Sequence, residues 1–142
     1  MRVFLCSFRD FSVAIPMHSV SSLALHDENT TLEEGANYIS FPRLFNLPID
    51  NIRHRIILKN YNDDENEIAE NRTVLFIPEV ECETEISIEK LHPVPKALSG
   101  TRFSLFFEGI QFNSRPELAL SKPVLLLKSE NLIKSDHKET IL

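Results

Sequence analysis

The chain has 142 residues, of which 42% are hydrophobic and 25% are charged, so it suits one globular domain with a substantial core. Its net charge of −6 argues against a nucleic-acid-binding protein that works by bulk attraction, and no glycine-rich phosphate motif is present. Two cysteines are too few for a disulfide scaffold and no apolar run reaches the length of a membrane helix, so we expect a reduced, cytoplasmic protein with no membrane insertion and no cofactor.

The amino-terminal segment predicts a β-hairpin. Residues 3–8 and 11–15 alternate apolar side chains between two faces, and Arg9 with Asp10 suits the turn between them. Pro16 is expected to end the pairing, because proline has no backbone N–H to donate.

The next segment, residues 16–25, predicts a short helix or a helical turn. Pro16 suits its first position, and the apolar residues recur at helical spacing, at Met17, Val20, Leu23 and Ala24. Residues 26–37 are polar and predict an exposed loop, and residues 41–48 form an apolar link interrupted by prolines.

Residues 51–60 predict a strand with a basic face. Arg53 and Arg55 lie two residues apart, so both leave an extended strand by one face, while His54 points the other way with Ile52 and Ile56. Either the arginines are simply solvated on an exposed sheet face, or the strand recognises an acidic or carbonyl-rich partner.

An acidic loop over residues 60–71 and a strand over 73–77 follow. Glutamates then alternate with smaller residues, which predicts a strand with an acidic outer face, at Glu79, Glu81, Glu83 and Glu85. We expect Cys82 to lie inside and to be inert. The four carboxylates either form a solvated edge that discourages strand addition or attract a cation or basic partner.

The carboxyl-terminal part predicts two more strands. Residues 87–91 resemble a single helical turn and 92–95 are extended before prolines. The apolar run 103–112 predicts a strand with a kink or bulge at Gly109, and 123–127 predicts a buried strand. Residues 113–117 are expected to form a turn and 134–142 a frayed tail.

Eight to ten short strands with little helix predict an all-β barrel or sandwich in one domain, residues 1–142. The search for an enzyme finds no catalytic motif, and the histidines lack the spacing of paired metal ligands: His18, His26, His54, His92 and His137. Cys6 lies in an apolar strand pattern, where burial makes a thiol a weak nucleophile.

The order of segments resembles the CheW family, the coupling proteins of bacterial chemotaxis. Residues 50–57 are similar to the first half of that family's signature strand, with the asparagine, both arginines and both isoleucines in register. Four further segments resemble the family in the same order: residues 4–15 with 20–23, 86–95, 107–110 and 124–132. The chain departs from the family where His54 replaces the glycine after the signature arginine and where Ser22 replaces the helix glutamate.

The resemblance implies two packed five-stranded SH3-like barrels with one or two short helices. It also implies a non-enzymatic adaptor that couples the cytoplasmic tip of a chemoreceptor to the regulatory domain of the histidine kinase CheA. By position, Arg53, supported by Asn51 and with Arg55 beside it, would contact the receptor. Val20 and Leu23 would face the kinase.

Two alternatives stay open. Arg53 could be only a solvated residue, and Val20 and Leu23 could be only core. A different function is that of a small acidic β-domain, unrelated to chemotaxis, which binds a cation or ligand through the glutamates at 79, 81, 83 and 85.

Overall fold

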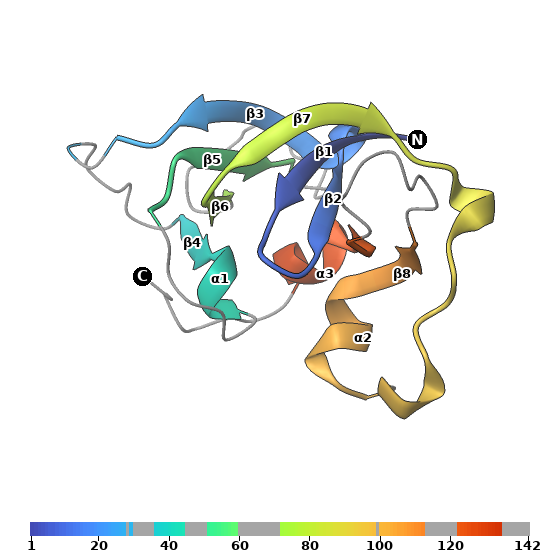
Figure 1. The fold of residues 1–142 in the computed structure, drawn as a ribbon. Coiled ribbons are helices and arrows are strands. Elements are labelled where there is room, and N and C mark those ends of the chain that lie inside the picture. The colour runs from blue at the N-terminus through green and yellow to red at the C-terminus, as the bar shows by residue number, and fades with distance from the viewer. Residues whose placement is uncertain are drawn as a thin grey trace. The chain divides into compact units, whose positions relative to one another are not determined.

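The computed structural model describes residues 1–27, 29, 36–44, 51–59, 72–98, 100–112 and 122–134. The chain divides into two compact units, each containing one β-sheet (Figure 1). Unit 1 consists of Met1–His18 and Val80–Asn131, and unit 2 consists of Ser19–Glu79 and Leu132–Leu142. The segment that builds unit 2 therefore interrupts the segment that builds unit 1.

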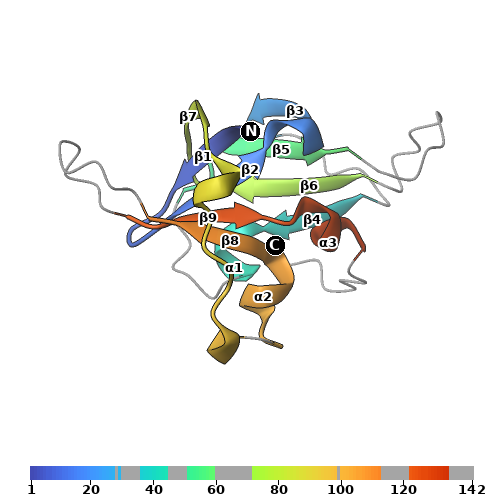
Figure 2. The ribbon, with the colours of Figure 1, turned by 90° about the vertical axis from the view of Figure 1, so that its right-hand side faces the viewer.

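Unit 1 contains a five-stranded mixed sheet in the order β7-β1-β2-β9-β8. Its strands are β1 (Arg2–Ser7), β2 (Ser12–Pro16), β7 (Val80–Glu85), β8 (Phe107–Gln111) and β9 (Val124–Leu127). The β2–β9 pair is parallel and the other pairs are antiparallel. Figure 2 shows β9 beside β8, which is the edge strand of this sheet.

The predicted hairpin is confirmed. β1 and β2 pair in antiparallel register, and the N–H of Phe8 donates to the carbonyl of Phe11 at 2.9 Å across the turn. The pairing extends one residue beyond the prediction, because Pro16 lies opposite Val3 as the last residue of β2. A proline is tolerated at a strand terminus, where its missing N–H interrupts no later pair.

The core of unit 1 joins residues from both of its segments. Val3, Ala14, Ile86 and Leu126 form a buried cluster, with Leu91 and Val124 packed against it. The predicted buried strand at 123–127 is confirmed as β9, in which Leu125, Leu126 and Leu127 are all buried. A strand that lies between two others and is covered on both faces has this continuous apolar pattern.

The apolar run at 103–112 divides into two elements, so the prediction of one strand is partly wrong. Helix α2 (Arg102–Phe106) precedes β8. Apolar runs of this length do not distinguish a buried helix from a strand. The predicted bulge is confirmed, because the register with β9 shifts between Phe107 and Gly109.

Gly109 lies where another backbone segment approaches closely. Ile110 and His92 exchange two backbone hydrogen bonds of 2.8 and 2.9 Å. A Cβ at position 109 would lie 2.9 Å from the carbonyl oxygen of His92, closer than real Cβ contacts. Only glycine fits this approach without a shift of the backbone.

Unit 2 contains a four-stranded mixed sheet in the order β3-β5-β6-β4, one strand fewer in the described residues than the five expected. Its strands are β3 (Val20–Leu25), β4 (Asn37–Ser40), β5 (His54–Leu58) and β6 (Thr73–Ile77). The predicted strand at 73–77 is confirmed, and the strand at 51–60 is confirmed with its first residue at His54. The sequence reading missed β4 and the short helix α1 (Phe41–Leu44), in which Phe41 and Leu44 are buried.

Both faces of this sheet bury apolar side chains. One face carries Ile39, Ile56, Leu75 and Ile77, each no more than 3% exposed. On the other face Tyr38, Val74 and Phe76 cluster with Ala36, Ile52 and Ile57. Ile52 therefore packs with Ile57, and its predicted alignment with Ile56 is wrong, because Ile52 precedes the first paired residue of the strand.

Of the short helix or helical turn predicted over residues 16–25, the structure contains the turn but no longer helix. Only one 3₁₀ turn, η1 (Met17–Ser19), is present, and β3 follows it. The register between β3 and β5 shifts between Val20 and Ser22, so Ser21 is an extra residue on β3. This bulge puts residues 20 and 23 on one face at a spacing of three, which is the spacing that a helix would give.

The single helical turn predicted at 87–91 is confirmed as η3 (Ile88–Lys90), and no helix forms over 92–95. Two further short helices, η4 (Lys96–Leu98) and α3 (Ser129–Lys134), were not predicted. Several predictions fall outside the described residues: the acidic loop at 60–71, the turn at 113–117, residues 135–142 of the tail, and most of the loop at 26–37. Within the described ranges, no helix is long and apolar enough to cross a membrane.

Candidate functional site

Arg53 lies immediately before β5, with a fixed backbone and an exposed side chain. Its N–H donates to the carbonyls of Ile77 and Pro78, both at 3.2 Å, and its own carbonyl accepts the N–H of His26 at 2.8 Å. The side chain is 68% exposed. Backbone hydrogen bonds thus fix the point from which the Arg53 side chain projects, while its guanidinium group is exposed to solvent.

The one charged neighbour recorded for Arg53 in the described residues is Glu79. The guanidinium Nη1 lies 3.8 Å from Oε1 of Glu79, whose side chain is 58% exposed. An ion pair this long and this exposed contributes at most about 1 kcal/mol. Arg53 can therefore exchange Glu79 for a partner's acceptor at little cost.

Asn51 and Arg55 flank Arg53 but differ in exposure. Asn51 is exposed. Arg55 is half-buried, donates from Nε to Nδ1 of His26 at 3.0 Å, and donates from Nη2 to the carbonyl of Asp27 at 2.7 Å. The two arginines that the sequence placed on one face therefore differ in how far they are engaged, because the Arg55 side chain lies on the face of the sheet that carries the aromatic cluster of Phe76.

The second predicted surface lies on β3, an edge strand of the unit 2 sheet. Val20 is half-buried and Leu23 is 38% exposed. The register places both opposite alternate residues of β5, Leu58 and Ile56, on one face. Neither residue belongs to the buried core, so both remain available for contact.

Sequence reasoning missed Leu25, which is 76% exposed and follows on the same face of β3. The spacing could have predicted this position, since Leu25 is two residues after Leu23 and residues two apart share a strand face. The segment was interpreted as helical, and residues two apart do not share a helix face. The strand presents an uncharged sequence with exposed leucines, where edge strands usually carry charges.

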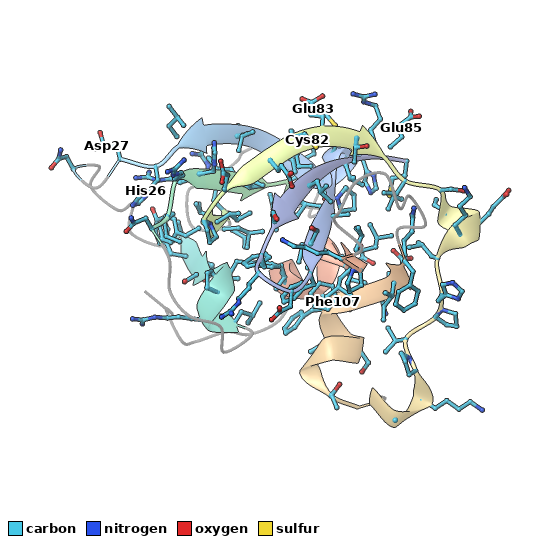
Figure 3. The ribbon with its side chains drawn as sticks, viewed as in Figure 1. His26, Asp27, Cys82, Glu83, Glu85 and Phe107 are labelled. Atoms are coloured by element: carbon cyan, nitrogen blue, oxygen red, sulfur yellow. The ribbon has the colours of Figure 1, made fainter. Side chains whose placement is uncertain are left out.

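The acidic strand β7 contains a second bulge that breaks its alternation. Its register with β1 shifts between Leu5 and Cys6, so that Leu5 pairs with Cys82 and Cys6 with Val80. Glu83 accepts a 3.2 Å hydrogen bond from Arg2. Figure 3 shows Glu83 and Glu85 along β7.

The two cysteines differ in exposure. Cys82 is exposed, so its predicted burial is wrong; β7 is an edge strand whose middle is open to solvent. Partial burial and the nearby Glu81 carboxylate raise the pKa of Cys82. Cys6 is buried as expected, and burial, with a smaller contribution from Cys82, raises its pKa to about 12. Neither thiol is activated as a nucleophile.

Within the part of the chain that the structure describes, no group of three or more His, Cys, Asp or Glu side chains could hold a metal ion. Of the four glutamates considered as ligands of a cation, two form ion pairs with arginines: Glu79 with Arg53, and Glu83 with Arg2. The acidic residues of β7 therefore supply no coordinating set.

One comparison with known proteins identifies the fold. The crystal structure of the scaffolding protein TtCheW from Thermoanaerobacter tengcongensis is similar to this chain, with a TM-score of 0.66 over 97% of this chain and 90% of that protein. The two sequences are 16% identical. No protein-family model and no curated protein matches the sequence. The chain thus has a CheW-like fold, which confirms the fold that the resemblance implied.

Proposed function

We propose that this chain is a non-enzymatic adaptor of bacterial chemotaxis, acting in the cytoplasm. It joins the cytoplasmic tip of a chemoreceptor to the regulatory domain of the histidine kinase CheA by protein–protein contacts. Arg53 and Asn51, supported by Arg55, form the receptor-binding surface. Val20 and Leu23, together with Leu25, form the kinase-binding surface.

The observation that carries this proposal is the exposed guanidinium of Arg53, held on a fixed backbone in a chain with a CheW-like fold. Arginine is favoured at the centre of protein–protein contacts because its planar group donates several hydrogen bonds at once. A contact residue of this kind needs a defined backbone and a side chain without a strong internal partner, and Arg53 has both.

The kinase-binding surface is supported by the exposed leucines of β3. Apolar side chains that are fully covered on binding supply most of the affinity of a protein–protein contact, and charged rims supply less. The proposal thus assigns two different chemistries to unit 2: a cationic contact at the start of β5 and an apolar contact on β3.

Capture by a receptor cytoplasmic fragment tests the first surface. Arg53→Ala is expected to weaken capture by on the order of 1–3 kcal/mol and to leave the melting temperature nearly unchanged. Arg2→Ala is a matched control in unit 1, because Arg2 also forms an exposed ion pair, with Glu83 at 3.2 Å. Equal capture of wild type and Arg53→Ala would remove Arg53 from the site.

Capture by the kinase regulatory domain tests the second surface. Leu25→Glu is expected to weaken this capture by on the order of 2 kcal/mol, because the new carboxylate loses water without gaining a partner. Ile88→Glu, at a residue of unit 1 that is 58% exposed, is the control. Equal effects of the two substitutions would argue against a kinase contact on β3.

A further inference from the structure

Four residues of unit 2 form a cluster around His26: His26 itself, Asp27, Arg55 and Phe76 (the His26 cluster). His26 and Asp27 follow the last residue of β3 (Figure 3). The His26 ring packs edge-on against Phe76, with 5.3 Å between ring centroids and 66° between ring planes. The Arg55 guanidinium carbon lies 5.8 Å from the same Phe76 centroid. The cluster thus fixes the His26 ring on two sides.

The backbone of His26 forms a hydrogen bond to the backbone of Arg53. Its N–H donates to the Arg53 carbonyl at 2.8 Å, and its Nδ1 accepts the Nε–H of Arg55 at 3.0 Å. Arg55 also donates to the carbonyl of Asp27 at 2.7 Å, so it holds both residues of the segment. One of the backbone hydrogen bonds of Arg53 thus comes from a residue whose ring is held by Arg55.

The bond from Arg55 to His26 requires a neutral imidazole. Arginine is always protonated and can only donate, so Nδ1 of His26 must present a lone pair. An imidazolium carries protons on both nitrogens, and it would also place a cation beside the Arg55 guanidinium. Protonation of the ring therefore removes this bond and adds a repulsion.

We propose that His26 is a positioning residue for Arg53, and that protonation of its imidazole loosens the segment that holds the Arg53 backbone. This inference rests on the proposed function, because it concerns how the receptor-binding arginine is presented. Adaptor binding through Arg53 is then strong when His26 is neutral and weaker when its imidazole is protonated.

The charged groups around His26 come from two sides. From the β5 side, the Arg55 guanidinium opposes a positive charge on the ring. From the segment of His26 itself, the Asp27 carboxylate favours a positive charge on the ring, although it already accepts the N–H of Asn29 at 2.9 Å. From β6 the neighbour is the uncharged Phe76 ring, on which Tyr38 of β4 stacks at 5.6 Å. The Arg55 guanidinium, which is bonded directly to the ring, thus acts against the Asp27 carboxylate.

Hydrogen exchange of the His26 amide in the full chain tests the inference without any partner. The protection factor, corrected for the intrinsic effect of pH, is expected to fall about tenfold between pH 8 and pH 5.5 in wild type, as one charge-assisted hydrogen bond is lost. In His26→Asn, the side-chain oxygen is attached to Cγ, as Nδ1 is in histidine, so it can accept the hydrogen bond from Arg55. Asparagine does not titrate, so the protection of the amide at position 26 should stay high at both pH values. His26→Phe keeps a ring against Phe76 without an acceptor, so its protection should be low at both.

His18→Asn is the matched control, because His18 is an exposed histidine just before the start of β3. It should behave as wild type. A His26 amide that is equally protected at both pH values in wild type, or a pH response that persists in His26→Asn, would overturn the inference.

Receptor-fragment capture at the two pH values then links the cluster to binding. Wild type should bind more weakly at pH 5.5, and His26→Asn should bind equally at both. Capture that depends on Arg53 but not on pH would overturn the positioning role alone. No capture by any variant, with the exchange results as expected, would overturn the proposed function and leave the intramolecular switch in place.

Discussion

At the scale of single residues, Arg53 and Arg55 differ in whether the fold engages their guanidinium groups. The sequence predicted an exposed Arg53 from the spacing of a half-buried strand, and the structure confirms that exposure. It did not predict the engagement of Arg55, because the acceptor His26 lies 29 positions away in the sequence. Local patterns give the direction of a side chain, whereas its partner depends on how distant segments pair.

Cys6 shows how burial of one thiol makes stability depend on pH. Its pKa is raised from 9.0 to about 12 in the folded chain, so the fold favours the neutral thiol. The resulting stabilisation is present at pH 9 and below, and it is lost as the pH rises from 9 toward 12. Over this range the loss should be about 1.4 kcal/mol per pH unit.

Urea unfolding of wild type and Cys6→Val between pH 8 and pH 11 measures this contribution. The difference in unfolding free energy should grow in favour of the valine variant as the pH rises. Cys82→Ser, at the exposed cysteine, should follow the wild-type pH dependence closely. Parallel curves for wild type and Cys6→Val would contradict the assignment.

At the scale of elements, uninterrupted apolar patterns were a reliable guide and bulges were the main source of error. β1, β2, β6 and β9 were predicted because their apolar residues repeat without interruption. The extra residue in β3 imitated a helical spacing, and the shift in β7 separates Val80 from the face that Cys82 and Thr84 share. An inserted residue moves the side chains that follow it in the strand to the opposite face of the sheet, and the local composition does not predict where the insertion occurs.

Gly109 gives a prediction about one element. Gly109→Ala places a methyl group 2.9 Å from the His92 carbonyl oxygen, so either β8 or the segment at His92 must move. The unfolding free energy should fall by on the order of 1–3 kcal/mol. Gly100→Ala is a useful comparison, since nothing lies within 4 Å of a Cβ there and any cost comes from its positive φ of 81°. A stable Gly109→Ala variant would mean that the His92–Ile110 pairing is dispensable.

At the scale of the whole molecule, the sequence resemblance predicted the fold even though no single segment was conclusive. The order of strands along the chain survives changes of individual residues, because it depends on patterns of burial rather than on identities. The number of strands in each sheet, and the parallel pairs β2–β9 and β4–β6, required the structure. Parallel partners lie far apart in sequence and have no local signal.

Leu126 tests how unit 1 is held together from its two segments. It is 1% exposed and contacts residues of both segments, in a strand between β2 and β8. Leu126→Ala should lower the unfolding free energy by about 2–5 kcal/mol, through lost burial and the cavity left behind. Leu25→Ala, at an exposed leucine, should change it by less than about 0.5 kcal/mol. Similar effects of the two substitutions would contradict this division between core and surface.

The interruption of unit 1 by unit 2 has a consequence for synthesis on the ribosome. The β1–β2 hairpin emerges first, but its parallel neighbour β9 begins only at Val124. At about 5–20 residues per second, the hairpin waits several seconds for the strand that covers it. During that time Val13 and Ile15, both fully buried in the finished protein, are exposed to solvent or to a chaperone. The later-starting unit 2 can close first, because all four of its strands are translated before β7 appears.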